Sequence, residues 1–259
     1  MEFPLFRALA GLRGRARPAA AAPPSPAEPV PVEIEHAGAV LTIWLRRSAR
    51  ARRVSMRVDP RGGAIRLVVP DRMAKERAID FARANAGWIA ARTRRLPDRV
   101  PFADGVALPL FGTPHVVRHR ADARGTVWIE DGELHVAGRP EHLPRRLWDW
   151  FGARLSERMR PLVDDKAALI ERRAGRLTIR DTATQWGSCA RDGDMSFSTR
   201  LVFAPPEILD YLAAHEVAHL AYRNHGPRFW ATAERLTDGD MAACKAWLRR
   251  HGETLMRYG

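Results

Sequence analysis

The segment formed by residues 210–220 constrains the fold of this chain more than any other part of the sequence. It reads His-Glu-x-x-His at positions 215–219, and no Lys, Arg, Gly or Pro interrupts it. Two prolines precede it at positions 205 and 206, and proline suits the first turn of a helix. We therefore expect a helix over residues 206–222. Both histidines then lie on one face of it, because residues four apart are neighbours on a helix.

Histidines at this spacing are suited to binding a metal ion. The Cβ atoms of such a pair lie about 5–6 Å apart, so His215 and His219 can both reach one zinc ion at roughly 2.0–2.1 Å. Glu216 is placed to reach a metal-bound water rather than the metal itself. The alternative is a helix with two incidental histidines, but burying these polar groups without a partner would be costly. The sequence therefore predicts a metal site.

A catalytic zinc usually has three protein ligands and one position left open for water. His225, ten residues after His215, is the first candidate for the third ligand. The chain must turn to bring it back, and Asn224 and Gly226 are residue types that tolerate left-handed geometry. Glu234, on the next expected helix, is the rival ligand. We favour His225 because it is nearer along the chain.

Further motifs stand in a fixed order around this segment. They are Trp186-Gly187-Ser188-Cys189, Arg200-Leu201, Asn224-His225-Gly226, Phe229-Trp230 and, nearer the N-terminus, residues 52–58, Phe81, Trp88-Ile89 and Leu110-Phe111-Gly112. Together they resemble the YgjP-like metallopeptidase family, a relative of the SprT-like zinc proteases. The resemblance implies one zinc ion held by His215, His219 and His225, with Glu216 as the catalytic base. One departure is Ser198-Thr199, which stands where an aromatic residue is expected.

Four other residues are candidates for binding substrate or stabilising an oxyanion: Arg200, Tyr211, Tyr222 and Trp186. Each also has a plainer interpretation. Arg200 suits a solvated strand face, and both tyrosines suit helix packing. Trp186 suits packing against the metal-binding helix. Cys189 could act as a further ligand or a nucleophile, although a small buried thiol is the simpler expectation.

Patterning along the chain predicts an α+β fold. Residues 1–31 are rich in Pro, Ala and Arg and predict a disordered arm. Residues 32–140 predict an antiparallel, β-rich N-terminal domain, as in the alternation of Val54, Met56 and Val58 with polar residues, together with one helix over residues 75–95. Residues 141–259 predict a mainly helical, zincin-like metallopeptidase domain. The sequence shows no internal repeat.

The formal net charge of the 259 residues is +13. It is consistent with a nucleotide or nucleic acid bound by the basic N-terminal region, or with a compositional bias toward arginine alone. Cys189 and Cys244 are the only cysteines, which favours a reducing, cytoplasmic location. No stretch approaches the roughly 18 apolar residues of a membrane-spanning helix, so no membrane partner is expected.

Three functions are compatible with these features. The favoured one is a zinc-dependent hydrolase that cleaves peptide bonds of a peptide or protein substrate, with zinc-activated water and Glu216 as general base. The first alternative is a nucleotide (UTP) pyrophosphatase, in which Arg53, Arg57 and Arg200 hold the triphosphate. The second is a DNA-associated protease like the SprT relatives. No pattern in the sequence indicates an oligomeric state.

Overall fold

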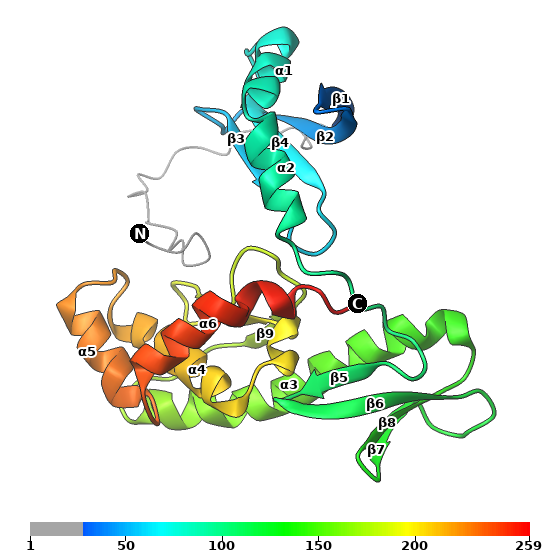
Figure 1. Ribbon diagram of the computed structural model, residues 1–259. Helices are drawn as coiled ribbons and strands as arrows, with labels where there is room; N and C mark the ends of the chain where they lie inside the picture. The colour runs from blue at the N-terminus through cyan, green and yellow to red at the C-terminus, as the bar shows by residue number, and fades with distance from the viewer. Residues whose placement is uncertain (1–27) are drawn as a thin grey trace, which may run out of the picture. The chain divides into compact units, whose positions relative to one another are not determined.

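The computed structural model describes residues 28–259, which form two compact units, residues 28–98 and residues 99–259 (Figure 1). The expected arm, residues 1–31, lies outside the described residues apart from residues 28–31. The first strand begins at Val30, two positions before the expected start at residue 32.

A four-stranded sheet forms the first unit. Its strands are β1 (Val30–His36), β2 (Ala39–Ser48), β3 (Ser55–Val58) and β4 (Ile65–Pro70), in the spatial order β1-β2-β4-β3. The hairpins β1–β2 and β3–β4 are antiparallel, but β2 and β4 run parallel. The sheet is therefore mixed and not purely antiparallel as expected, because alternation along a strand identifies the strand but not its neighbours.

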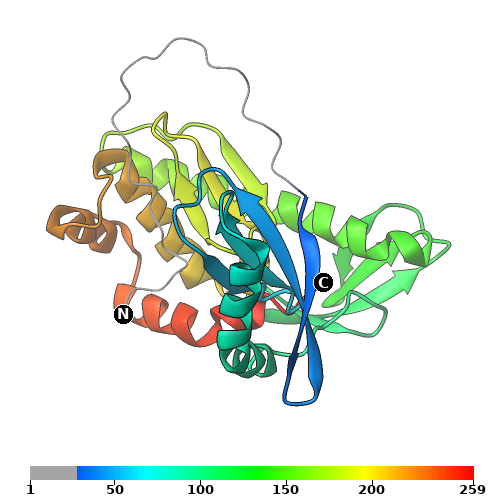
Figure 2. The same ribbon diagram turned by 90° about the horizontal axis from the view of Figure 1, so that it is seen from above.

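Two helices cover one face of this sheet (Figure 2). They are α1 (Lys75–Ala84) and α2 (Ala86–Arg94), where the sequence predicts a single helix over residues 75–95. Asn85 separates them, and its side-chain amide donates a hydrogen bond of 2.8 Å to the carbonyl of Phe81. Asparagine competes in this way with regular helix bonding. The small residues Ala78 and Ala82 let α1 approach the buried side of the sheet closely.

The second unit opens with another four-stranded sheet. Its strands are β5 (Ala107–Leu110), β6 (Thr113–Arg120), β7 (Val127–Glu130) and β8 (Glu133–Ala137), in the order β5-β6-β8-β7 with β6 and β8 parallel. This arrangement repeats that of the first sheet, two hairpins joined by one parallel pair. The one-turn helix η1 (Pro140–His142) and the long helix α3 (Leu143–Ala168) follow, and α3 continues through Pro161.

The remainder of the unit carries the metal-binding motif. The strands β9 (Leu177–Arg180), β10 (Gly187–Cys189) and β11 (Met195–Ser198) form a small sheet in the order β10-β11-β9. The segment η2 (Thr199–Phe203) leads into α4 (Pro206–Ala221), α5 (Pro227–Leu236) and α6 (Met241–Leu255). Helix α4 contacts α3, α5, α6 and β10 (Figure 1), so it is the central element of the unit.

The second sheet belongs with the helices and not with the first sheet. Leu108, Val117 and Leu134 from its strands share one hydrophobic core with Leu147 and Phe151 of α3. The compact units accordingly divide between Asp98 and Arg99, whereas the sequence interpretation places the division at residues 140–141. Residues 28–259 therefore form a mixed α and β fold, as the pattern of the sequence predicts.

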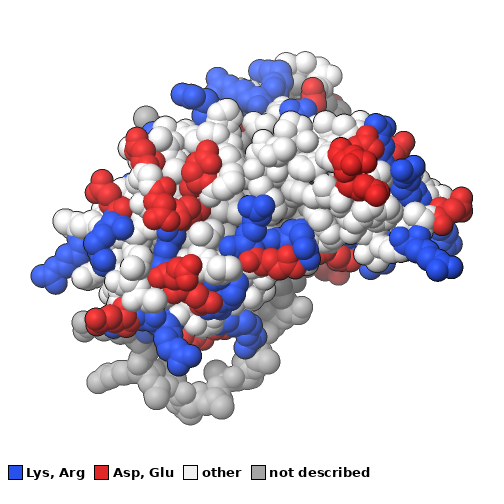
Figure 3. All heavy atoms as spheres, turned by 90° about the horizontal axis from the view of Figure 1, so that it is seen from below, with Lys and Arg blue, Asp and Glu red and all other residues white. Residues whose placement is uncertain are grey.

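Many of the basic side chains have acidic neighbours. Along α3, arginines pair with carboxylates three or four residues away, as in Arg145–Asp149 and Arg154–Glu157. The face of the molecule in Figure 3 shows basic and acidic side chains interspersed. Among residues 28–259, no helix combines the length and the apolar character needed to cross a membrane.

Candidate metal centre

The predicted helix forms as α4, which starts at Pro206 and ends at Ala221. Residues 208–219 are all buried, although they include Asp210 and three polar residues of the motif: His215 is 1% exposed, Glu216 3% and His219 8%. A helix that is buried on every side must satisfy its polar groups internally. The buried polar side chains of α4 are therefore the first candidates for a functional site in this unit.

Three histidines converge at the end of this helix. One ligating nitrogen from each of His215, His219 and His225 lies within 4.8 Å of the others, and the Nε2 atoms of His215 and His225 are 3.1 Å apart. Ligands about 2.0–2.1 Å from one tetrahedral ion lie a little over 3 Å from one another. The donor set and its spacing therefore fit a single divalent metal ion.

His225 reaches the cluster through a tight connection between α4 and α5. Helix α4 ends where Tyr222 adopts an extended conformation, with φ −133° and ψ 115°. The Gly226 N–H then donates to the Asn224 carbonyl at 2.8 Å. The expected left-handed residue at Asn224 or Gly226 is absent, since positive φ occurs at neither position. Extended residues at both ends of the connection, Tyr222 and Gly226, accompany the turn instead.

Neighbouring groups fix the orientation of the histidine rings. His219 Nδ1 lies 3.0 Å from the Tyr222 carbonyl oxygen, which leaves Nε2 directed at the cluster, as in many metal sites. Phe229 lies against all three rings, with centroid distances of 4.9 Å to His215 and 4.5 Å to each of the other two. Phe229 thus forms an apolar wall against the three imidazoles.

The protonation states of the histidines suit metal binding. Burial, reinforced by the neighbouring imidazoles, holds the pKa of His215 well below its usual range. Burial also lowers the pKa of His219 to about 4. Both rings are therefore neutral at physiological pH, and the neutral imidazole is the form that binds metal ions.

The side chain of Glu216, which follows His215 directly in α4, packs against strand β10. A Cβ atom added to Gly187 would lie only 2.5 Å from Glu216 Oε1, so the carboxylate packs directly on the backbone of that glycine. Complete burial raises the pKa of Glu216 to about 8. A divalent cation at the neighbouring histidines would lower that pKa, because an opposite charge favours the ionised carboxylate.

A family model described as the YgjP-like metallopeptidase domain matches residues 52–251. The chain belongs to the YgjP-like family. No curated protein and no solved structure matches it. Membership in a metallopeptidase family indicates a metal-dependent hydrolase, and the histidine cluster provides a place for the metal that such an enzyme requires.

Arg200 does not reach the histidine cluster of this YgjP-like domain. Its guanidinium forms an ion pair with Asp181 at 2.9 Å, donates to the Met256 carbonyl at 3.0 Å, and lies over the Trp148 ring. The side chain is 3% exposed. Arg200 is therefore not on a solvated strand face, and its guanidinium is already engaged by protein groups.

Trp186 and Tyr211 are buried, at 1% and 0% exposure. Trp186 packs against Gly252 of α6, where an added Cβ would lie 3.2 Å from the indole ring. The Tyr211 ring lies 6.1 Å from that of His215, and burial raises its pKa further above the usual range. Tyr222 contributes its backbone carbonyl, as described above. Its partly buried side chain packs against the cluster that contains Phe229. A role of these three side chains in binding an oxyanion stays a prediction.

The other two candidates are also placed. Burial raises the pKa of Cys189 to about 11, so it is a thiol at neutral pH, and Arg223 donates to its carbonyl at 3.1 Å. Glu234 is exposed on α5 and is not part of the histidine group. Between the two rival third ligands, the geometry therefore selects His225.

The sequence interpretation missed a buried ion pair behind the metal-binding helix. Lys166 of α3, only 3% exposed, lies 2.5 Å from Asp210 Oδ1 and donates to the Leu236 carbonyl at 2.6 Å. Asp210 also accepts from the Asp238 N–H at 2.7 Å. The pair ties α4 to α3 and to the end of α5. The only hint of this ion pair in the sequence is that Lys166 is a lysine in a chain whose basic residues are mostly arginines.

Proposed function

We propose that this protein is a zinc-dependent peptidase. His215, His219 and His225 would hold the zinc ion, and Glu216 would act as the general base. The observation that carries the proposal is the convergence of three imidazoles beside a buried carboxylate, at the end of helix α4. Zinc held by three neutral ligands lowers the pKa of a bound water to about 7 and polarises a carbonyl group.

Each residue then has a definite task. The three imidazoles supply binding without cancelling the charge of the ion. Glu216 accepts the proton of the attacking water and returns it to the leaving amine. Phe229 and the rest of the buried wall exclude bulk water from the inner side, so the open side of the cluster is where the substrate enters.

An exposed strand edge supports a peptide substrate. Strand β10 pairs only with β11 among the described strands. The Trp186 carbonyl and the Ala190 N–H form hydrogen bonds with β11 and its turn, so the backbone groups of Gly187 face the other edge of β10. The Cys189 N–H faces the same edge, whereas the Cys189 carbonyl already accepts from Arg223. An extended peptide can add to such an edge by backbone hydrogen bonds. Gly187 would bring that peptide beside Glu216.

The nucleotide pyrophosphatase alternative has less support. It needs Arg200 to hold phosphate, and that guanidinium is engaged by Asp181 and the C-terminal carbonyls. A triphosphate is also commonly processed with magnesium, which prefers oxygen ligands to imidazole. The basic N-terminal unit, which carries the remaining arginines of that proposal, is better explained by a separate binding role.

The test compares the wild type with Glu216→Gln and His225→Ala. We expect purified wild type to cleave casein and to lose this activity when a chelator removes the metal. Glu216→Gln should retain one equivalent of zinc by elemental analysis while its rate falls at least a hundredfold. His225→Ala should lose both the activity and the bound zinc. Phosphate released from UTP, measured in parallel, should stay at background.

Near-wild-type casein cleavage by Glu216→Gln would remove that residue from the role of base. Casein left intact, together with UTP hydrolysis that disappears in His225→Ala, would replace the peptidase with the pyrophosphatase.

A further inference from the structure

The sheet of the first unit has one face that its helices leave uncovered. Inward residues such as Ile43 and Leu45 pack on α1 and α2, and the alternate residues point the other way. On that outward face the strand register aligns Trp44 of β2 with Arg66 of β4, and Arg66 with Arg57 of β3. An indole and two guanidinium groups therefore stand in one row across three strands, about 4.8 Å apart.

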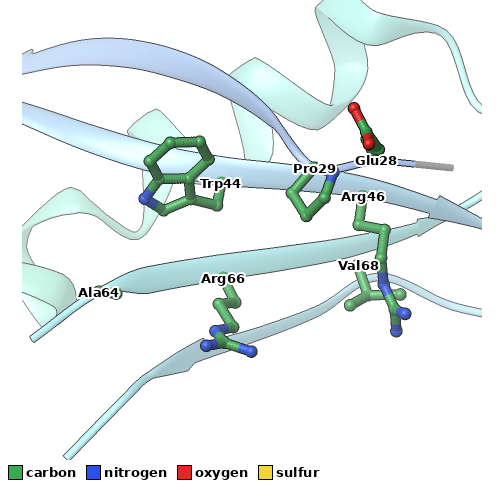
Figure 4. Close-up of a pocket in the computed structure, with 7 residues that line it drawn as sticks. All are labelled: Glu28, Pro29, Trp44, Arg46, Ala64, Arg66 and Val68. Atoms are coloured by element: carbon green, nitrogen blue, oxygen red, sulfur yellow. The ribbon is translucent and has the colours of Figure 1, made fainter. Parts of the chain in front are cut away.

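A second row reinforces the first. Arg46 lies two residues beyond Trp44 on the same face of β2 and pairs with Val68 in register. Figure 4 shows the side chains of Trp44, Arg46, Arg66 and Val68 projecting from the two strands around a pocket. The volume of this pocket is about 490 Å³. Trp44 is 42% exposed in its wall.

The charge on this face is available to a ligand. Among residues 28–259, neither Arg46 nor Arg57 has an ion pair or a side-chain hydrogen bond. Arg66 makes one exposed contact, at 3.3 Å to Asp59. The carboxylates of Glu33 and Glu35 share the face but stand on the edge strand β1, beside Thr42 and Val40, and Glu28 lies at the pocket rim.

We propose that this face binds single-stranded nucleic acid. An exposed indole on a flat sheet offers a stacking surface for one unpaired base, and nearby guanidinium groups can neutralise the phosphates on either side of it. A duplex would not satisfy Trp44, because its base faces are already stacked inside the helix. An acidic peptide would pair with the arginines but would leave the indole without a partner.

The first experiment uses fluorescence anisotropy to measure binding of the full-length protein to a fluorescein-labelled 15-mer of deoxythymidine. The matching oligouridine and a 15-base-pair duplex are run beside it. We expect micromolar or tighter binding of the single strands in 50 mM NaCl and at least tenfold weaker binding of the duplex. Raising the salt to 200 mM should weaken single-strand binding roughly tenfold, as expected when two or three phosphates are neutralised.

Variants separate stacking from charge. Trp44→Ala should raise the Kd at least fivefold, while Trp44→Phe should stay within about threefold because a phenyl ring still stacks. The matched control is Trp88→Ala: Trp88 is 50% exposed on α2 of the same unit, away from the sheet face, and its loss should leave the Kd unchanged. Arg57→Ala should reduce the slope of log Kd against log salt by about 0.7.

Several results would overturn the proposal. They are equal affinity of Trp44→Ala and wild type, absence of single-strand binding at 50 µM protein in 50 mM NaCl, and displacement of the oligonucleotide by polyglutamate of equal charge. Displacement by micromolar UTP would make the face a mononucleotide site. Glu216→Gln should bind the oligonucleotide as wild type does, so this proposal and the proposed peptidase activity can fail separately.

Discussion

At the scale of single residues, the Glu216 carboxylate restricts the size of the side chain that position 187 can hold. The Cα of Gly187 faces the Glu216 carboxylate so closely that an added methyl group would overlap Oε1 and lie 2.8 Å from Cγ. Glu216 cannot retreat easily, because it is fully buried in a helix that is packed on every side. The glycine is therefore needed for close approach rather than for backbone flexibility.

We expect Gly187→Ala to lower the rate of peptide hydrolysis at least tenfold while the protein still binds one equivalent of zinc. The displaced carboxylate would no longer reach the attacking water, whereas the three histidines are untouched. Steady-state kinetics and elemental analysis test this. Gly152→Ala is the control: nothing lies within 4 Å of that Cβ, and alanine is favoured over glycine in a helix, so activity should persist.

The residues of the metal site could be predicted from the sequence because one local pattern specifies them. Helical spacing places His215, Glu216 and His219 together, and His225 lies close enough along the chain to join them. Arg200 shows the limit of this reasoning. Its partners Asp181 and Met256 come from distant parts of the chain, and no local pattern states where a guanidinium group will point.

At the scale of elements, the turn between β3 and β4 depends on one carboxylate. Asp59 accepts hydrogen bonds from the Arg61 backbone N–H at 3.0 Å and from its guanidinium at 2.8 Å. The Arg61 guanidinium, through its hydrogen bond, holds the pKa of Asp59 below the ordinary value of 3.8, against the opposing effect of burial. The folded state therefore favours the ionised carboxylate.

A pH dependence of stability follows from this shift. A carboxylate whose pKa is lower in the folded state stabilises the protein above its unfolded pKa, and this contribution is lost as the pH falls. We expect the first unit of the wild type to lose more thermal stability between pH 5 and pH 3 than that of Asp59→Asn, as measured by scanning calorimetry. Asp80→Asn, at an exposed site with a weak 3.6 Å pair, should behave like wild type; if Asp59→Asn does too, Asp59 does not hold the turn.

Elements were predicted better than their connections. The helix expected over residues 206–222 and the strand expected around residues 54–58 form near those positions, because apolar periodicity is a local property. The parallel pairs β2–β4 and β6–β8 were not foreseen, since the order of strands depends on contacts between hairpins. The division of residues 75–95 into two helices depends on one asparagine whose side chain bonds to the preceding turn.

At the scale of the whole molecule, the division at residues 98–99 suggests two independently folding parts. Residues 99–259 contain a large core that includes Leu108, Phe151 and Leu255. The same unit contains every residue of the proposed metal site. The sequence interpretation places the boundary later, where the pattern changes from strands to helices, whereas β5–β8 pack with α3 in the second unit.

We expect a fragment comprising residues 99–259 to fold alone and to bind one zinc ion. Its unfolding should be cooperative, and zinc in excess should raise its melting temperature, since a ligand that binds only the folded state stabilises that state. Circular dichroism melts with and without chelator test this. The same fragment carrying His225→Ala should show no zinc-dependent rise. A fragment without cooperative unfolding would mean that the first unit is required for folding.

The two ends of this second unit are joined by backbone pairing. The Val100 N–H donates to the Arg257 carbonyl at 2.8 Å, and the Gly259 N–H donates to the Val100 carbonyl at 2.9 Å. The path of the chain through residues 99–259 is thus nearly a closed loop. This unit is therefore a candidate for circular permutation. A short linker would join its two ends, and the chain would be opened at a surface turn such as Asp131-Gly132.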